Sequence, residues 1–209
     1  MIREEIIREV QEEAKNQTIV AATKYVGIPE IKELVRLGIT DIGENRVYNF
    51  LEKYEALKNL DITWHFIGHL QSKKVKKMID KIDYLHSLDR LSLAGEIQKH
   101  REIPLKCFVQ VNISSEESKY GLPKGNVIDF CKKMQDYDKI HIVGLMGMAE
   151  LTFDDEAIEK QFQSLVDLKD EVNKALNLDL KYLSMGMSND YRIAIKVGAT
   201  HLRLGSILF

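Results

Sequence analysis

The sequence predicts an α/β protein, a single (β/α)8 TIM barrel over residues 1–209, with an extra helix at the N-terminal end. Short apolar runs rich in β-forming residues alternate with longer helical patterns, and this alternation is typical of βαβ units in a parallel sheet. Eight strand-like runs occur, with no break in composition between them. Because no Gly-x-Gly-x-x-Gly segment follows the first run, the barrel is favoured over a doubly wound open sheet.

The elements can be placed in order from their periodicity. An amphipathic helix is predicted over residues 2–15, where isoleucines recur at helical spacing among Arg and Glu. The eight predicted strands are residues 18–23, 39–42, 62–68, 82–87, 105–112, 140–147, 180–186 and 201–204. The helical patterns between them are residues 29–37, 44–59, 71–80, 89–101, 124–136, 155–176 and 189–197. Gly38 and Gly198 each precede a strand, where a glycine is the usual end of a helix.

Composition excludes several classes of protein. The chain has 30 Lys and Arg against 32 Asp and Glu, a net charge of −2, so a strongly basic nucleic-acid or membrane-surface protein is not expected. The apolar runs are far shorter than the ~20 residues of a membrane helix, and the charged N-terminus lacks the apolar segment of a signal peptide. Two cysteines without a Cys-x-x-Cys spacing indicate neither a disulfide scaffold nor structural zinc. We expect a cytoplasmic protein with no metal, nucleic-acid or membrane partner.

The first strand ends in a lysine. Strand alternation places Val20, Ala22 and Lys24 on one face, so Lys24 would stand in the mouth of the barrel if that face is interior. Active sites of such barrels lie at the carboxyl ends of the strands. A lysine whose pKa is lowered by partial burial and a nearby cation can form a Schiff base with an aldehyde. The alternative, a solvated loop lysine, is favoured when this segment is considered alone.

A phosphate site is predicted after the last two strands. Residues 184–190 run from a strand into a helix that Ser188 could cap, and a helix N-terminus binds anions. The last predicted strand, residues 201–204, contains Arg203 and is followed by Gly205 and Ser206, in the region where barrels usually bind phosphate. A capped helix and a surface ion pair would explain each segment separately, but their joint position favours a phosphate. A ligand carrying both an aldehyde and a phosphate, such as pyridoxal 5′-phosphate (PLP), would use both sides of the mouth.

At these residues the chain resembles the PLP homeostasis protein family, which is related to the N-terminal barrel of alanine racemase. The matching segments span the chain in order: Ala22-Thr23-Lys24, Gly43-Glu44-Asn45-Arg46, Trp64-His65-Phe66-Ile67-Gly68-His69-Leu70-Gln71, His86-Ser87-Leu88-Asp89, Val111-Asn112-Ile113, Gly144-Leu145-Met146, Leu183-Ser184-Met185-Gly186-Met187-Ser188-Asn189-Asp190 and Arg203-Leu204-Gly205.

The resemblance implies a role for particular residues. It implies a PLP Schiff base on Lys24 and phosphate contacts from Ser188, Gly205 and Ser206. It places Arg203 at the pyridine nitrogen. It also implies cofactor contacts from Asn45, Ser184 and Met187. No residue is assigned a catalytic role.

Three functions follow as hypotheses. The first is a PLP carrier in intracellular PLP homeostasis, which exchanges reversibly with amino acids and passes PLP to apo-enzymes without committed catalysis. An always-protonated guanidinium cannot protonate the ring nitrogen as a carboxylic acid would, so Arg203 would restrain carbanion chemistry. The second is a weak amino-acid racemase. We expect the second domain of alanine racemase and its catalytic tyrosine to be absent, and therefore a monomer. The third is a PLP-independent phosphosugar enzyme that uses Lys24 as a Schiff-base lysine.

Two further groups of residues are given structural explanations. His65 and His69 are four residues apart at a strand end rather than on a helix, so we do not expect a metal site there. A basic run in residues 73–77 is interpreted as a solvated helix face, with an anion-binding or partner-binding patch as the alternative.

Overall fold

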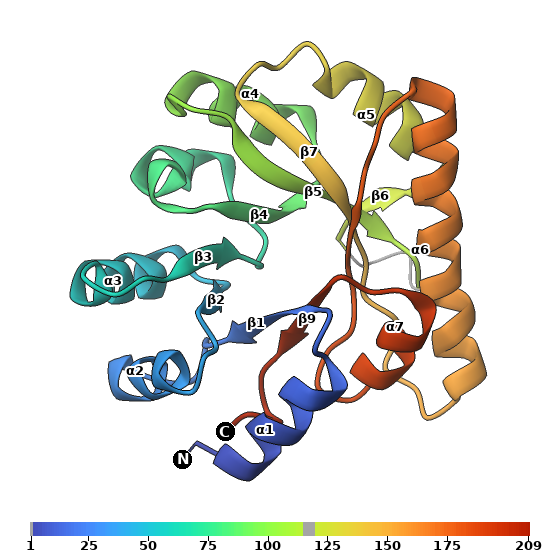
Figure 1. The fold of residues 1–209 in the computed structure, drawn as a ribbon. Coiled ribbons are helices and arrows are strands. Elements are labelled where there is room, and N and C mark those ends of the chain that lie inside the picture. Colours follow the sequence, from blue (N-terminus) through green and yellow to red (C-terminus); the bar gives the residue numbers. More distant parts are fainter. Residues whose placement is uncertain (1, 115–119) are drawn as a thin grey trace.

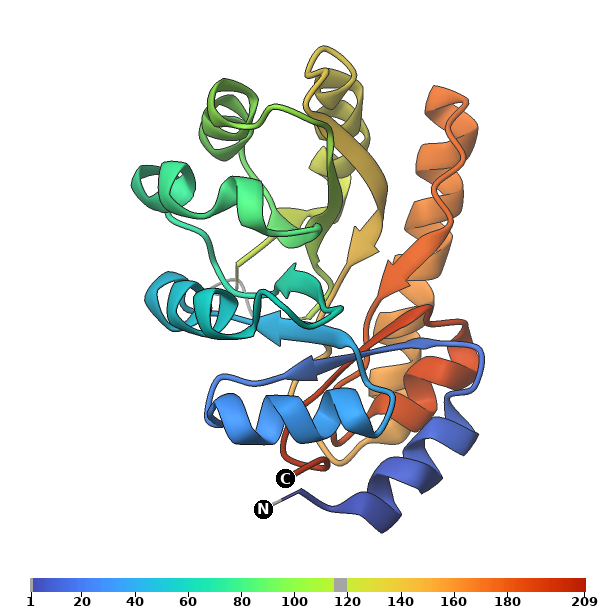
Figure 2. The same ribbon diagram turned by 60° about the vertical axis from the view of Figure 1, so that its left-hand side comes forward.

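The computed structural model describes residues 2–114 and 120–209. Eight parallel strands form a closed barrel surrounded by helices (Figures 1 and 2). The barrel strands are β1 (Thr18–Ala22), β2 (Asp41–Glu44), β3 (Thr63–Phe66), β4 (Tyr84–Leu88), β5 (Leu105–Asn112), β7 (Ile140–Met146), β8 (Tyr182–Ser184) and β9 (His201–Leu204). Pairing of β4 with β5 and of β1 with β9 closes the ring. The predicted (β/α)8 barrel is confirmed.

The helices lie outside the ring and cover its apolar outer face. They are α1 (Glu4–Glu13), α2 (Ile28–Arg36), α3 (Val47–Leu57), α4 (Leu91–His100), α5 (Val127–Met134), α6 (Asp155–Leu176) and α7 (Tyr191–Val197). The extra N-terminal helix α1 is present, and its Glu13 accepts hydrogen bonds from Tyr191 and Arg192 of α7. The two chain ends lie side by side next to α1 (Figure 1), where the Arg3 N–H donates to the Leu208 carbonyl at 3.1 Å.

The structure corrects two local predictions. The helix predicted over residues 71–80 consists of two 3₁₀ helices, η1 (Ser72–Lys77) and η2 (Ile79–Lys81). Like charges three and four residues apart destabilise an α-helix, and Lys73 with Lys76 and Lys77 supplies such pairs. A two-residue strand, β6 (Leu122–Pro123), pairs with the end of β5 and was not predicted, because two residues carry no periodic signal; a third 3₁₀ helix, η3 (Lys124–Asn126), follows it.

Strand β2 extends further than predicted, to Glu44, and this brings an acidic side chain into the core. Lys53 of α3 forms an ion pair with Glu44, and both side chains are buried. The Lys53 ammonium also donates to the Thr23 carbonyl at 2.7 Å, and the Thr23 hydroxyl donates to the Glu44 carboxylate at 3.2 Å. The buried ion pair therefore fixes the backbone immediately before Lys24.

The Glu44–Lys53 pair makes a prediction about stability. Replacing Lys53→Met should lower the free energy of unfolding by about 3–5 kcal/mol, because the buried carboxylate loses its counter-charge. Urea unfolding measures this loss. Lys58→Met is the control: Lys58 pairs with Glu55 on the surface of the same region, and its loss should stay within about 1 kcal/mol. If the two variants lost the same free energy of unfolding, the buried Glu44–Lys53 pair would contribute no more to stability than the surface pair.

Candidate functional site

The sequence-predicted residues meet at the carboxyl ends of the strands. Lys24 lies two residues beyond β1, and Asn45 directly follows β2. Ser188 lies between β8 and α7, while Gly205 and Ser206 follow β9. Because all barrel strands are parallel, these five positions share one mouth although they are far apart in sequence.

Lys24 lies on the rim of this mouth, just after β1. Its side chain is exposed, so the partial burial expected from the sequence is not found, and the ammonium lies 4.6 Å from the centre of the Tyr25 ring. The preceding inward residue is small: Ala22 lies so close to Gly205 that a Cβ atom on Gly205 would be 3.5 Å from the Ala22 Cβ. The ends of the adjacent strands β1 and β9 therefore approach each other with little side-chain bulk between them.

Ser188 lies on the nearby loop after β8, which only β9 separates from β1 in the barrel. Its hydroxyl oxygen accepts the N–H groups of Gly205 at 3.1 Å and Ile207 at 3.3 Å. With two bonds accepted, the hydroxyl hydrogen remains available to donate to a ligand. The loop after β8 and the loop after β9 are thus joined around one hydroxyl, in the place where the sequence predicted a phosphate.

The prediction that Ser188 caps the following helix is wrong. Helix α7 begins at Tyr191, with Asp190 in the N-cap position. The Asp190 carboxylate accepts the Met187 N–H at 2.5 Å and closes the turn before the helix. Ser188 is consequently free to bond the backbone after β9 instead.

Asn45 carries an acceptor without a partner. Its side-chain oxygen is buried, and no hydrogen-bond partner for it exists within the described residues. The loop that contains Gly68 packs closely against the backbone of Asn45: a Cβ atom on Gly68 would lie 2.4 Å from the Asn45 main-chain carbonyl oxygen. Buried polar atoms are rarely left unsatisfied, so this oxygen is suited to a ligand that donates a hydrogen bond.

Arg203 lies deeper, inside the barrel. Its guanidinium donates to the Ser184 hydroxyl at 2.7 Å and to the Gly147 carbonyl at 3.2 Å, which uses two of five N–H groups in the described part of the chain. Burial lowers the pKa of Arg203 to about 10, so the side chain stays charged at neutral pH. The remaining N–H groups can meet an acceptor above it.

The polar side chains beneath Arg203, which are His86, His65 and Asp41, were not predicted to be part of the site. The Ser184 hydroxyl lies 2.7 Å from His86 Nδ1, His86 Nε2 lies 2.9 Å from His65 Nδ1, and His65 Nε2 lies 2.8 Å from the Asp41 carboxylate. Burial, with His65 and Arg203 nearby, holds the pKa of His86 well below its usual range. Alternation along the strands could have indicated that both histidines face inward, but not that they touch.

The remaining predicted positions have simple surroundings. Ser184 is fully buried below Arg203, and Met187 is partly exposed at the rim.

Other kinds of site find no support in the described residues. Cys107, which is not among the predicted site residues, is buried, and burial raises the pKa of its thiol. Residues 2–114 and 120–209 contain no cluster of three or more His, Cys, Asp or Glu that could hold a metal. No helix among them is long and apolar enough to cross a membrane.

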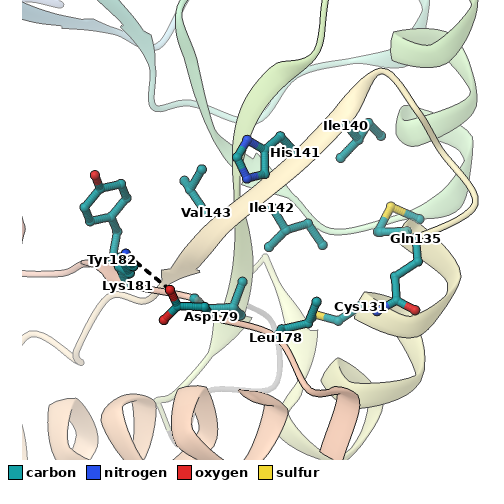
Figure 3. Close-up of a pocket in the computed structure, with 12 residues that line it drawn as sticks. Cys131, Gln135, Ile140, His141, Ile142, Val143, Leu178, Asp179, Lys181 and Tyr182 are labelled. Carbon is teal, nitrogen blue, oxygen red and sulfur yellow. Dashed lines mark ion pairs between the residues drawn. The ribbon is translucent and has the colours of Figure 1, made fainter. Parts of the chain in front are cut away.

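A pocket elsewhere on the barrel lies away from these residues. It is lined by residues 140–143 at the start of β7, by residues 178–182 before and within β8, and by Cys131 of α5 (Figure 3). An ion pair between Lys181 and Asp179, 3.2 Å long, lies at its edge. Because this pocket is at the amino ends of the strands, it is not part of the candidate site.

Comparisons with known proteins agree with this geometry. The family described as alanine racemase, N-terminal domain, matches residues 4–209. The pyridoxal phosphate homeostasis protein of Aquifex aeolicus is 40% identical over 194 residues, 91% of this chain and 85% of the relative. The protein of the same name from Pasteurella multocida is 33% identical over 217 residues, 100% of this chain and 93% of the relative.

Solved structures show the same architecture. PipY of Synechococcus elongatus with PLP bound has a TM-score of 0.89 and 28% identity, with 99% of both chains covered. An alanine racemase from E. faecalis has a TM-score of 0.73 and 15% identity, covering 98% of this chain and 57% of that chain, and shows the fold alone. The chain therefore belongs to the alanine racemase N-terminal domain family and, within it, to the pyridoxal phosphate homeostasis proteins.

Proposed function

We propose that this protein binds PLP in the barrel mouth as a Schiff base on Lys24 and serves intracellular PLP homeostasis without committed catalysis. The observation that carries the proposal is the placement of Lys24 at the same mouth as a buried arginine and the Ser188–Gly205 contact. Relatives named for PLP homeostasis, and a similar structure with PLP bound, support it.

Each part of PLP matches a group at the mouth. The Ser188 hydroxyl and the Ser206 amide suit the phosphate, whereas the Gly205 amide donates to the Ser188 oxygen here and would have to leave it to reach the phosphate. Arg203 suits the ring nitrogen, because it offers only N–H donors to an acceptor. The unpartnered oxygen of Asn45 can accept a hydrogen bond at the same mouth.

Two other predicted contacts complete the proposed site. Ser184 would act on the cofactor through Arg203, since both described contacts of its hydroxyl are to His86 and Arg203. Met187 would place its thioether at the rim of the site.

The chemistry of the chain is limited to capture and release. When bound, PLP supplies an aldehyde and an electron-accepting ring. Lys24 would hold PLP through its amine, with the aldehyde oxygen released as water. Arg203 would keep its own proton and offer the ring nitrogen only a hydrogen bond, so the ring would draw electrons weakly. The site thus holds PLP while restraining proton removal from an attached amino acid.

Attachment to Lys24 can be tested by borohydride reduction and peptide mass mapping. The reduced protein should carry one pyridoxyl group on the peptide with Lys24, and Lys24→Ala should remove that adduct, because the proposed Schiff base is on this amine. Lys15→Ala, at an exposed position before β1, should leave the adduct unchanged. An undiminished adduct in Lys24→Ala protein would move the attachment to another lysine.

A racemase activity is the second candidate, favoured by the barrel shared with alanine racemases. In D₂O, we expect L-alanine to change the absorption spectrum of the PLP-loaded protein, while deuterium enters its Cα position more slowly than about 1 s⁻¹, the lower end of usual enzyme turnover. We expect slow exchange because Arg203 would not protonate the ring nitrogen of PLP, so the ring would stabilise a carbanion at Cα weakly. Arg203→Glu, which introduces a proton donor, should accelerate the exchange. Deuterium entry at an enzyme-like rate in the unaltered protein would identify a racemase-like enzyme.

Delivery of PLP to apo-enzymes is part of the same proposal, as are a cytoplasmic location and a monomeric state. A carrier of this kind would keep the free aldehyde low and release PLP to proteins that bind it more tightly.

A further inference from the structure

Five polar side chains form a continuous hydrogen-bonded chain through the barrel interior. It leads from Arg203 at the mouth through Ser184, His86 and His65 to Asp41 at the amino end of β2. Four of them are buried, whereas the Asp41 side chain is 27% exposed. The interior of a TIM barrel is ordinarily filled with branched apolar side chains. This chain of polar groups therefore needs an explanation.

The two ends dictate the direction of every bond. Arg203 can only donate, and the Asp41 carboxylate can only accept. The Ser184 oxygen accepts from Arg203, so its single hydrogen is directed to His86 Nδ1. His86 then carries its proton on Nε2 and donates to His65 Nδ1. His65 in turn donates from Nε2 to Asp41, and both histidines are neutral.

The reverse arrangement is unfavourable. If His86 donated to Ser184, the Ser184 hydrogen would have no acceptor among its partners in the described residues. His65 would then have to be a buried cation to donate to both His86 and Asp41. Burying an additional charge and an unpaired hydroxyl hydrogen is costly.

Aromatic neighbours hold the imidazole rings in place. His65 stacks on Tyr84 with 4.6 Å between ring centres and a 2° angle between planes. His86 stacks on Phe108 with a centre distance of 4.4 Å. His201 is near both histidines, but its Nδ1 contacts the Thr200 hydroxyl and it is outside the chain. Stacking restricts the rotation of the rings and so preserves the direction of the bonds.

We propose that Asp41, His65 and His86 are positioning residues that keep Ser184 as an acceptor and thereby fix Arg203 for the ring nitrogen of PLP. This inference rests on the proposed function. It extends the site across the barrel, from the mouth to an aspartate at the opposite end. Of the two described contacts of the Arg203 guanidinium, one is to Ser184 at the end of this hydrogen-bonded row of side chains, and the other is to the Gly147 carbonyl.

The bond direction can be read without PLP. In protein labelled with ¹⁵N-histidine, long-range ¹H–¹⁵N spectra at pH 7 should show His65 and His86 as neutral rings protonated on Nε2. Asp41→Asn should preserve both tautomers, since the amide oxygen can accept the same bond. A His86 ring protonated on Nδ1 in the unaltered protein would overturn the inference.

The effect on the cofactor is read from PLP release by the loaded protein. His86→Phe keeps a ring beside Phe108 but removes the acceptor of the Ser184 hydrogen, so PLP should leave about tenfold faster, with an altered absorption maximum. Asp41→Asn should release PLP within about twofold of the unaltered rate. Unchanged release and absorption in folded His86→Phe protein would contradict the inference.

A second variant keeps the test decisive if His86→Phe does not fold. Asp41→Leu removes the acceptor at the partly exposed end without touching a buried ring, and it should disturb the His65 tautomer and speed release. If both readings match the unaltered protein, the inference fails. Absence of any PLP adduct on Lys24 in the unaltered protein would instead refute the proposed function, while the tautomers would still be readable.

Discussion

A guanidinium enclosed in a barrel must be satisfied from within, and this constraint organises the interior of the molecule. Arg203 is buried on β9, and desolvation lowers its pKa without neutralising it at physiological pH. Water cannot surround the charge, so hydrogen-bond acceptors must come from neighbouring strands. The Ser184 hydroxyl and the Gly147 carbonyl provide them, and the histidines beneath Ser184 give its own hydrogen a destination. A polar interior follows from one buried cation.

The mouth above this cation depends on a different buried pair. Glu44 and Lys53 join β2 to α3 and bond the backbone and hydroxyl of Thr23, next to Lys24. These bonds fix the backbone just before Lys24. The Lys24 side chain is exposed, so its amine remains accessible. This division suits a lysine that captures and releases an aldehyde. A rigid base and an open amine would permit exchange, whereas the buried Arg203 would restrain further reaction.

Sequence reasoning succeeded where the signal was local or periodic. The bounds of β5, β9 and α6 agree with the prediction to the residue, because each is a long or clearly delimited periodic run. The parallel topology, itself predicted from the alternation of elements, is enough to put Lys24, Ser188 and Arg203 at one end of the barrel. The capping role of Ser188 failed because Asp190, two residues on, closes the turn instead. The hydrogen-bonded side chains from Arg203 to Asp41 come from five different strands, and such contacts depend on strand register and barrel closure, which no single segment encodes.

A crystal structure of the protein with PLP tests the central claim most directly. We expect continuous density between Lys24 and the cofactor, the phosphate on Ser188 and the amides of Gly205 and Ser206, and an Arg203 nitrogen within hydrogen-bond distance of the ring nitrogen. Arg203 should keep its contact with Ser184. A phosphate bound elsewhere, or a ring nitrogen facing away from Arg203, would contradict the account of one site at the carboxyl ends of β1, β8 and β9.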